Sequence, residues 1–255
     1  MPHKRYGNDH HSIFTTFSNC AAVTFALESA NVVGYNTLNT GDTFQMLGSS
    51  FAGVGTNVDG FTLGSLQGSF ADEDAIQVSY MDDDGIVQFT TYQYLTVDGF
   101  GMDADGWYDG NYELANDTMI PRGSAVWFIS SEPKSIQTSG EVATEDTTHA
   151  AFTEQYSMIC SAYPVAFNPN ASTVTWSGLV DEDEIQVAYV DSDGIVQFNV
   201  YQYLTVDGFG MDADGWYDGN YELVSDPIAG VGQGFWLILS DFANVTLTEK
   251  SPIAK

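Results

Sequence analysis

The sequence predicts an all-β fold, built as two tandem homologous β-sandwich or barrel-like domains with little helix. A 39-residue stretch, residues 76–114, recurs at residues 185–223 without a gap and with only five differences. Short segments alternate apolar and polar residues as half-buried strands do, and turns rich in Gly, Asp and Asn separate them. Long amphipathic helical patterns are missing from the sequence, and residues 62–67 predict at most one or two helical turns.

The repeat sets the expected division of the chain. It extends beyond the near-identical stretch, because residues 125–128 align with 234–237 and residues 44–47 with 156–159. We therefore expect one β domain at residues 31–139 and a second at residues 140–250, each of ordinary domain size. Residues 1–30 form a leader-like or disordered segment in this division, and residues 251–255 form a tail. A period of 109 residues is too long for a solenoid repeat.

The strands follow in order along each copy. Residues 76–80 alternate apolar and polar side chains, and Asp84-Gly85 supplies the residue types of a tight hairpin turn. Residues 86–95 are the expected return strand. Residues 125–129 and 235–239 are nearly continuous apolar runs, typical of strands covered on both faces. The tryptophans inside these two runs, Trp127 and Trp236, are therefore expected in the core.

The N-terminal segment has the shape of a signal peptide. Lys4 and Arg5 precede a moderately apolar stretch, residues 13–27, and the small residues Thr24 and Ala26 favour cleavage after Ala26. This pattern predicts export, with a secreted or cell-surface location. The alternative interpretation is a disordered tail or an ordinary first strand. No apolar run elsewhere in the sequence reaches membrane-spanning length.

The charge balance excludes two classes of partner. The 255 residues include 35 acidic and 6 basic residues, for a net charge of −29. Nucleic acid and anionic lipid surfaces both require the opposite charge, so neither is an expected partner. The acidic clusters at residues 72–74, 82–84 and 181–184 are interpreted as solvated surface, which favours solubility.

Three motifs carry a family resemblance. Residues 31–35 (NVVGY), the GWYD motif at 106–109 and 215–218, and residues 232–237 (GQGFWL) resemble a set of uncharacterised, secreted bacterial β-repeat proteins. The resemblance implies the fold and export. It implies no catalytic residues, because none is established for such proteins. Residues 122–127 depart from the glycine-rich form of the last motif, which makes the first copy the less typical one.

The segment whose residues are best suited to binding a metal ion is an acidic, glycine-rich loop that occurs in both copies. Its aspartates follow a D-x-D-G-x-x-D spacing, and carboxylates in a tightly turning loop are what calcium prefers. The alternative is a pair of Asp-Gly turns in which Asp caps its own backbone, and this is the favoured interpretation. An EF-hand is excluded by the spacing. The candidate calcium ligands are Asp103, Asp105, Asp109, Asp212, Asp214 and Asp218.

The same loops carry candidate ligand-binding aromatics. Rings beside amide and carboxylate groups are typical of a sugar-binding face, whereas Trp and Tyr also commonly close a β core. Both interpretations stay open for the two tryptophans, since loops tend to be exposed. The candidate residues are Trp107, Tyr108, Tyr112, Trp216, Tyr217 and Tyr221.

The sequence contains few combinations of residues that could form a catalytic site. His149 is the only histidine beyond the leader, has no counterpart in the first copy, and is interpreted as a surface residue. Cys160 lies in an apolar context that predicts a buried, inert thiol. Glu113 and Glu222 are the candidate acids if the protein is a glycan-acting hydrolase.

The predicted function is therefore a non-catalytic, exported structural, adhesive or interaction protein. Its duplication makes it bivalent, with an extracellular glycan or a surface protein as the expected partner. The first alternative is a calcium-assisted carbohydrate-binding module, and the distant alternative is the hydrolase. Calcium is the only cofactor that the sequence suggests.

Overall fold

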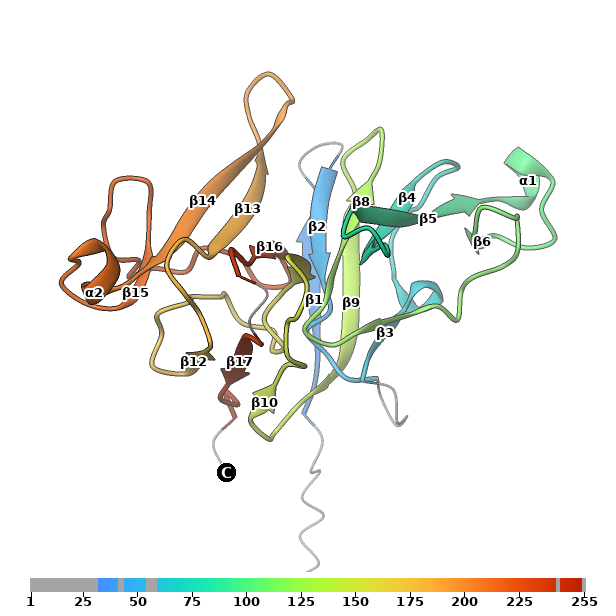
Figure 1. Ribbon diagram of the computed structural model, residues 1–255. Helices are drawn as coiled ribbons and strands as arrows, with labels where there is room; N and C mark the ends of the chain where they lie inside the picture. The colour runs from blue at the N-terminus through green and yellow to red at the C-terminus, as the bar shows by residue number, and fades with distance from the viewer. Residues whose placement is uncertain (1–31, 41–43, 54–58, 242–243, 254–255) are drawn as a thin grey trace, which may run out of the picture. The chain divides into compact units, whose positions relative to one another are not determined.

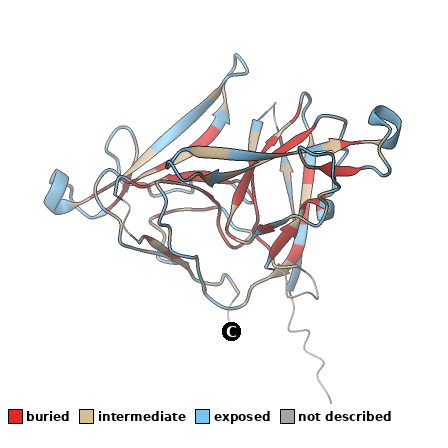
Figure 2. Cartoon of the chain, turned by 45° about the vertical axis from the view of Figure 1, so that its right-hand side comes forward, coloured by how far each residue is buried: buried red, intermediate tan, exposed pale blue. Residues whose placement is uncertain are grey.

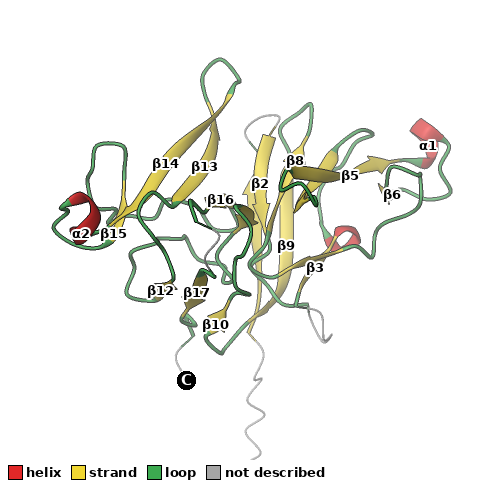
Figure 3. Ribbon diagram, in the orientation of Figure 1, coloured by secondary structure: helices red, strands yellow, loops and turns green. Residues whose placement is uncertain are grey.

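The computed structural model describes residues 32–40, 44–53, 59–241 and 244–253, and antiparallel strands make up most of its regular structure (Figure 1, Figure 3). The all-β prediction is confirmed. Helix within these residues is limited to three short pieces: η1 (Leu63–Ser65), α1 (Val97–Phe100) and α2 (Val206–Phe209). None of them has the length and apolarity to span a bilayer. The predicted signal peptide lies outside the described residues.

The duplicated sequence forms the same five-stranded sheet twice. The first sheet has the order β2 (Phe44–Gly48), β8 (Ala125–Ile129), β4 (Ala75–Met81), β5 (Val87–Leu95) and β6 (Gly106–Tyr108). The second repeats that order with β11 (Tyr156–Ile159), β16 (Phe235–Ile238), β13 (Glu184–Val190), β14 (Val196–Leu204) and β15 (Gly215–Tyr217). The register is also shared, because Ile76 pairs with Tyr92 and Ile185 with Tyr201.

The smaller sheets differ between the copies, as their sequences do. In the first copy β1 (Val32–Asn39) pairs with β9 (Ser135–Val142), and β3 (Gly60–Thr62) pairs with β7 (Met119–Pro121). In the second copy β17 (Thr246–Glu249) lies between β10 (Thr147–Thr148) and β12 (Val174–Ser177). Contacts along the chain group residues 31–255 into one compact unit. The division into domains at residues 139 and 140 stays a prediction.

Each copy has its own apolar core, and a third cluster lies between the copies. One core gathers around Trp107 and the other around Trp216. The third cluster contains Trp127 and Trp236, which are buried as the apolar runs predicted. Figure 2 shows buried residues along the sheets and exposed residues on the α1 and α2 segments. The remaining members of the third cluster are Met46, Ala125, Met158, Cys160 and Ala188.

Contacts between the copies come in pairs that the repeat relates. The amide of Gly48 donates to the carbonyl of Gly232 at 2.8 Å, and the equivalent Cys160 amide donates to Gly123 at 2.9 Å. The aromatic contacts repeat in the same way. Phe89 meets Trp236 and Phe198 meets Trp127, each with ring centroids 6.4 Å apart and ring planes at 80°. The two sheets therefore meet through equivalent surfaces, as the subunits of a twofold dimer do.

Equivalent residues of the two copies face each other at the position where the twofold axis of such a dimer would pass. A Cβ atom added to Gly234 would lie 2.3 Å from the Cβ of Ala125, its counterpart in the first copy. A Cβ atom added to Gly48 would lie 2.6 Å from the Cβ of its counterpart, Cys160. Real Cβ atoms do not approach this closely, so one member of each pair must be glycine. The two sheets can therefore pack only because each pair combines a glycine with a residue that has a Cβ atom.

Candidate functional site

The predicted binding loops have the same geometry in both copies. Helix α1 begins after Thr96, whose Oγ1 accepts a hydrogen bond from the Gly99 amide at 3.0 Å, and it ends before Gly101, which has φ of 70°. Asp72 fixes the start of the loop, because its carboxylate accepts the Thr96 amide at 2.7 Å. Thr205, Gly208, Gly210 and Asp181 make the same arrangement around α2.

The candidate calcium ligands of the first copy divide into two kinds. Asp105 accepts a hydrogen bond from the Val97 amide at 2.8 Å, and Asp109 accepts from the amides of Asn111 and Glu113 at 2.9 Å. The amide of Glu113, followed by that of Asn111, lowers the pKa of Asp109 below its ordinary value. Both carboxylates therefore hold the turns of their own loop, whereas Asp103, exposed as Asp105 is, accepts no hydrogen bond within the described residues.

The second copy repeats this pattern. Asp214 accepts from Val206, Asp218 accepts from Asn220 and Glu222, and Asp212 is exposed. Among the residues that the structure describes, no three His, Cys, Asp or Glu side chains are grouped in a way that could hold a metal ion. Calcium binding stays a prediction.

Four of the six candidate aromatics lie inside the protein. Trp107 is 1% exposed and Trp216 is 0% exposed, so position in a loop does not expose them. Trp107 packs against Phe70 and Tyr94, with ring centroids 5.1 and 5.4 Å away. Tyr108 is also buried and donates its hydroxyl to the Ala104 carbonyl at 2.7 Å; Tyr217 does the same with Ala213 at 2.6 Å. These rings build the core and are not free to stack on a ligand.

The other two candidate aromatics, Tyr112 and Tyr221, are 64% and 62% exposed. We call the segments that carry them, residues 109–113 and 218–222, the tyrosine turns. Both tyrosines have φ of 61°, in the left-handed region that non-glycine residues seldom occupy. Within each turn the tyrosine amide donates to the carbonyl of Asp109 or Asp218 at 3.0 Å. The candidate hydrolase acids Glu113 and Glu222 lie exposed on these same turns, one in each copy.

The acidic clusters are only partly the solvated surface that the sequence suggested. Asp74 and Asp183 are buried, so the surface interpretation is wrong for both. The Asp74 carboxylate accepts a hydrogen bond from the Ala71 amide at 2.8 Å, and its Oδ2 atom lies 3.5 Å from the Nζ atom of Lys134. In the second copy Asp183 accepts the Ser240 amide at 2.8 Å. A buried carboxylate needs such partners to offset its lost hydration.

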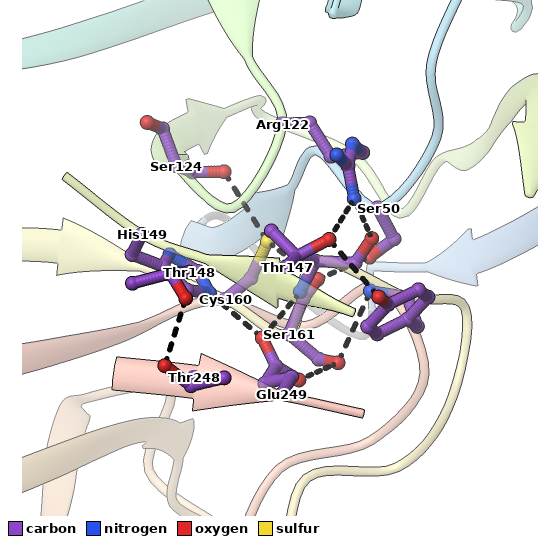
Figure 4. Close-up of polar contacts among 12 residues, drawn as sticks. Ser50, Arg122, Ser124, Thr147, Thr148, His149, Cys160, Ser161, Thr248 and Glu249 are labelled. Atoms are coloured by element: carbon purple, nitrogen blue, oxygen red, sulfur yellow. Dashed lines mark hydrogen bonds and ion pairs between the residues drawn. The ribbon is translucent and has the colours of Figure 1, made fainter. Parts of the chain in front are cut away.

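A buried polar network escaped the sequence analysis, and Figure 4 shows its centre. The Glu249 carboxylate contacts the Nε2 atom of His149 at 2.7 Å and accepts from the hydroxyl of Ser161 at 2.6 Å and from the amide of Ala162 at 2.8 Å. The prediction that His149 is a surface residue is wrong, because only 6% of its side chain is exposed. Gly123 makes room for the imidazole, since a Cβ atom there would lie 2.5 Å from the ring.

This network stabilises structure and is not arranged as a nucleophile system. The Ser161 hydroxyl donates to the carboxylate, so its proton is not directed at the imidazole that would have to accept it. Burial raises the pKa of the neighbouring Cys160 thiol to about 12, so the thiol is protonated at neutral pH. The prediction of a buried thiol is confirmed. One sequence signal was present for Glu249: it lies two residues after Leu247, on the same face of β17.

Comparisons of the chain with protein-family models, curated proteins and solved structures find no match. The resemblance to secreted β-repeat proteins therefore stays a prediction. What the chain does has to be argued from the geometry of its own residues.

Proposed function

We propose that the protein is a non-catalytic, exported interaction protein of structural or adhesive type. It binds through two like faces, centred on Tyr112 in the first copy and Tyr221 in the second. The observation that carries this proposal is the backbone conformation of these two exposed tyrosines.

Tyrosine is energetically unfavourable at a turn position whose backbone lies in the left-handed region. The conformation costs a residue with a Cβ atom about 1 kcal/mol or more, whereas glycine or asparagine adopts it readily. The two rings are mostly exposed, so their packing offsets little of this cost. Yet both copies have tyrosine at this position. Strained residues of this kind concentrate at functional sites, which supports a role for the rings beyond folding.

The surroundings of the rings suit a binding face. Leu114 and Leu223 follow the turns and are exposed, and Asp109 and Asp218 fix the turns through their amide hydrogen bonds. Tyrosine gives a large, amphipathic contact area at a low entropy cost. Because the face occurs twice in one chain, a surface with repeated ligands would be held by both faces together. An extracellular glycan or a surface protein provides such repeated ligands.

Asparagine variants of the turns test this proposal, because asparagine tolerates the same backbone conformation. Binding of wild type, Tyr112→Asn, Tyr221→Asn and the double variant is measured on an array of immobilised glycans and on an array of surface proteins. Each single variant should lose avidity by roughly 10²-fold or more, and the double variant should lose binding. Tyr80→Asn and Tyr189→Asn are matched controls on exposed strand positions. Wild-type binding by the double variant, or no binding by wild type on either array, would refute the proposal.

Export is inferred from the leader-like segment and from the resemblance to secreted β-repeat proteins. If residues 1–26 are a signal peptide, the protein recovered outside the producing cell begins at Leu27. Intact mass measurement of that protein tests this directly. Retention of Met1 in the extracellular protein, or recovery of the protein only from inside the cell, would contradict export through this segment.

A further inference from the structure

A cavity of about 540 Å³ lies where a hairpin of the first copy meets the sheet of the second. The hairpin between β4 and β5 contributes Ile86 and Val87, and the sheet contributes the rings of Tyr156 and Trp236. The contact between Phe89 and Trp236 holds the hairpin over this sheet. The tyrosine turns contribute nothing to the lining, so the cavity is separate from the proposed binding faces.

The chemistry of the lining is unusual for so acidic a protein. None of the residues around the cavity carries a formal charge, although the chain as a whole has a net charge of −29. Besides the rings and aliphatic groups, two side-chain amides line it, those of Gln155 and Gln186. Gln186 donates to Glu184 at 3.0 Å, which leaves its carbonyl oxygen as an acceptor. In the described part of the chain, the side-chain amide of Gln155 makes no hydrogen bond, whereas its backbone carbonyl accepts one from the Leu239 amide at 2.8 Å.

These features select one class of ligand. An anion would meet the negative field of the protein without any cation to hold it, and a cation would find no carboxylate in the lining. A wholly apolar ligand would bury the two amides without partners, which is costly. A neutral ring with one apolar face and hydroxyl groups at its edge satisfies both parts of the lining.

We propose that this cavity binds a neutral saccharide of one or two pyranose rings. The half-buried Tyr156 ring contacts the apolar face of the sugar, beside the rim of the Trp236 ring, which is 9% exposed. The side-chain amides of Gln155 and Gln186 exchange hydrogen bonds with its hydroxyl groups. The volume lies within the range of known small-molecule sites, roughly 300–1,000 Å³.

The chain supplies its own comparison for this site. The repeat aligns Phe44 with Tyr156, Trp127 with Trp236, and Ile195 with Ile86. The first copy therefore offers a similar ring surface without the tyrosine hydroxyl.

The experiment is calorimetric titration of the full chain with cellobiose, lactose and maltose, and with digalacturonate as an anionic counterpart. We expect at least one neutral disaccharide to bind with one site per chain and digalacturonate not to bind. Ile86→Glu should weaken that binding at least tenfold, because it places a charge in the lining. Ile195→Glu, at a similarly exposed position on the other hairpin, should leave it unchanged.

Two results would overturn the inference: no neutral disaccharide binds at millimolar concentration, or binding survives Ile86→Glu. The Tyr112→Asn/Tyr221→Asn variant separates this site from the tyrosine turns. Saccharide binding should persist in that variant. Its loss there, with binding retained in Ile86→Glu, would assign the sugar to the turns and contradict a site in the cavity.

Discussion

Gly234 gives the most direct test of how the two copies meet. In Gly234→Ala the new methyl group would lie 2.3 Å from the Cβ of Ala125, more than 1 Å closer than an ordinary carbon contact. Both atoms are fixed to backbone in strands or beside them, so neither can rotate away. Overpacking of this kind costs about 2 kcal/mol, which lowers Tm by roughly 4–8 °C in a chain of this size.

The partner substitution should reverse the effect. Ala125→Gly alone removes one buried methyl group and adds backbone freedom, at a cost of about 1.5 kcal/mol. In the double variant the methyl group moves to the other side of the contact and fills the vacated space. We expect its free energy of unfolding to lie within about 1 kcal/mol of wild type, which gives a coupling energy of about 2.5 kcal/mol.

Urea unfolding of the four proteins measures this cycle. Gly230→Ala is the control, because its added Cβ atom would meet only the Gln233 side chain, at 3.5 Å. A double variant as unstable as the sum of the two single variants would refute the contact between the copies. Additivity is what distant sites show, whereas residues in contact show coupling.

Two further predictions concern the buried network. Because burial raises the pKa of Cys160 from 9.0 to about 12, the unfolded thiol ionises above pH 9 while the native thiol keeps its proton. The free energy of unfolding should therefore fall between pH 9 and 12, by up to about 1.4 kcal/mol per pH unit, and Cys160→Ala should reduce this slope in urea unfolding. Equal slopes in the two proteins would contradict the assignment. Glu249→Gln should lower the free energy of unfolding by about 3 kcal/mol, because an amide nitrogen replaces one acceptor of the network. Thermal melts compare wild type with Glu249→Gln, and the exposed Glu154→Gln is the control. Equal Tm values for wild type and Glu249→Gln would show that the Glu249 carboxylate is not needed.

The sequence predicts most of the sheets, because strand formation is a local property. Alternation at residues 76–80 and the Asp84-Gly85 turn indicate the β4–β5 hairpin, and the apolar run around Trp127 indicates a buried strand. Gly85 has φ of 75°, the conformation for which a glycine is favoured in the turn. These features depend on residues within a few positions of one another.

Side-chain burial in the loops is harder to predict, because it depends on segments far apart in the sequence. The Asp- and Gly-rich surroundings of Trp107 leave both exposure and burial open, and only the structure shows that Phe70 and Tyr94 cover it. The Glu249 network likewise requires β17 to lie beside the segment that carries Ser161, a contact between residues 88 positions apart. Neither contact has a local signal strong enough to specify the partner.

In the proposed function, Tyr112 and Tyr221 form two equivalent binding faces. Surface plasmon resonance tests this on a sensor surface that densely carries a glycan or surface protein bound by wild type on the arrays. Wild type is compared with Tyr112→Asn, Tyr221→Asn and the double variant. The two single variants should dissociate at similar rates, each much faster than wild type, and the double variant should not bind. Dissociation of the double variant at the wild-type rate would contradict the claim.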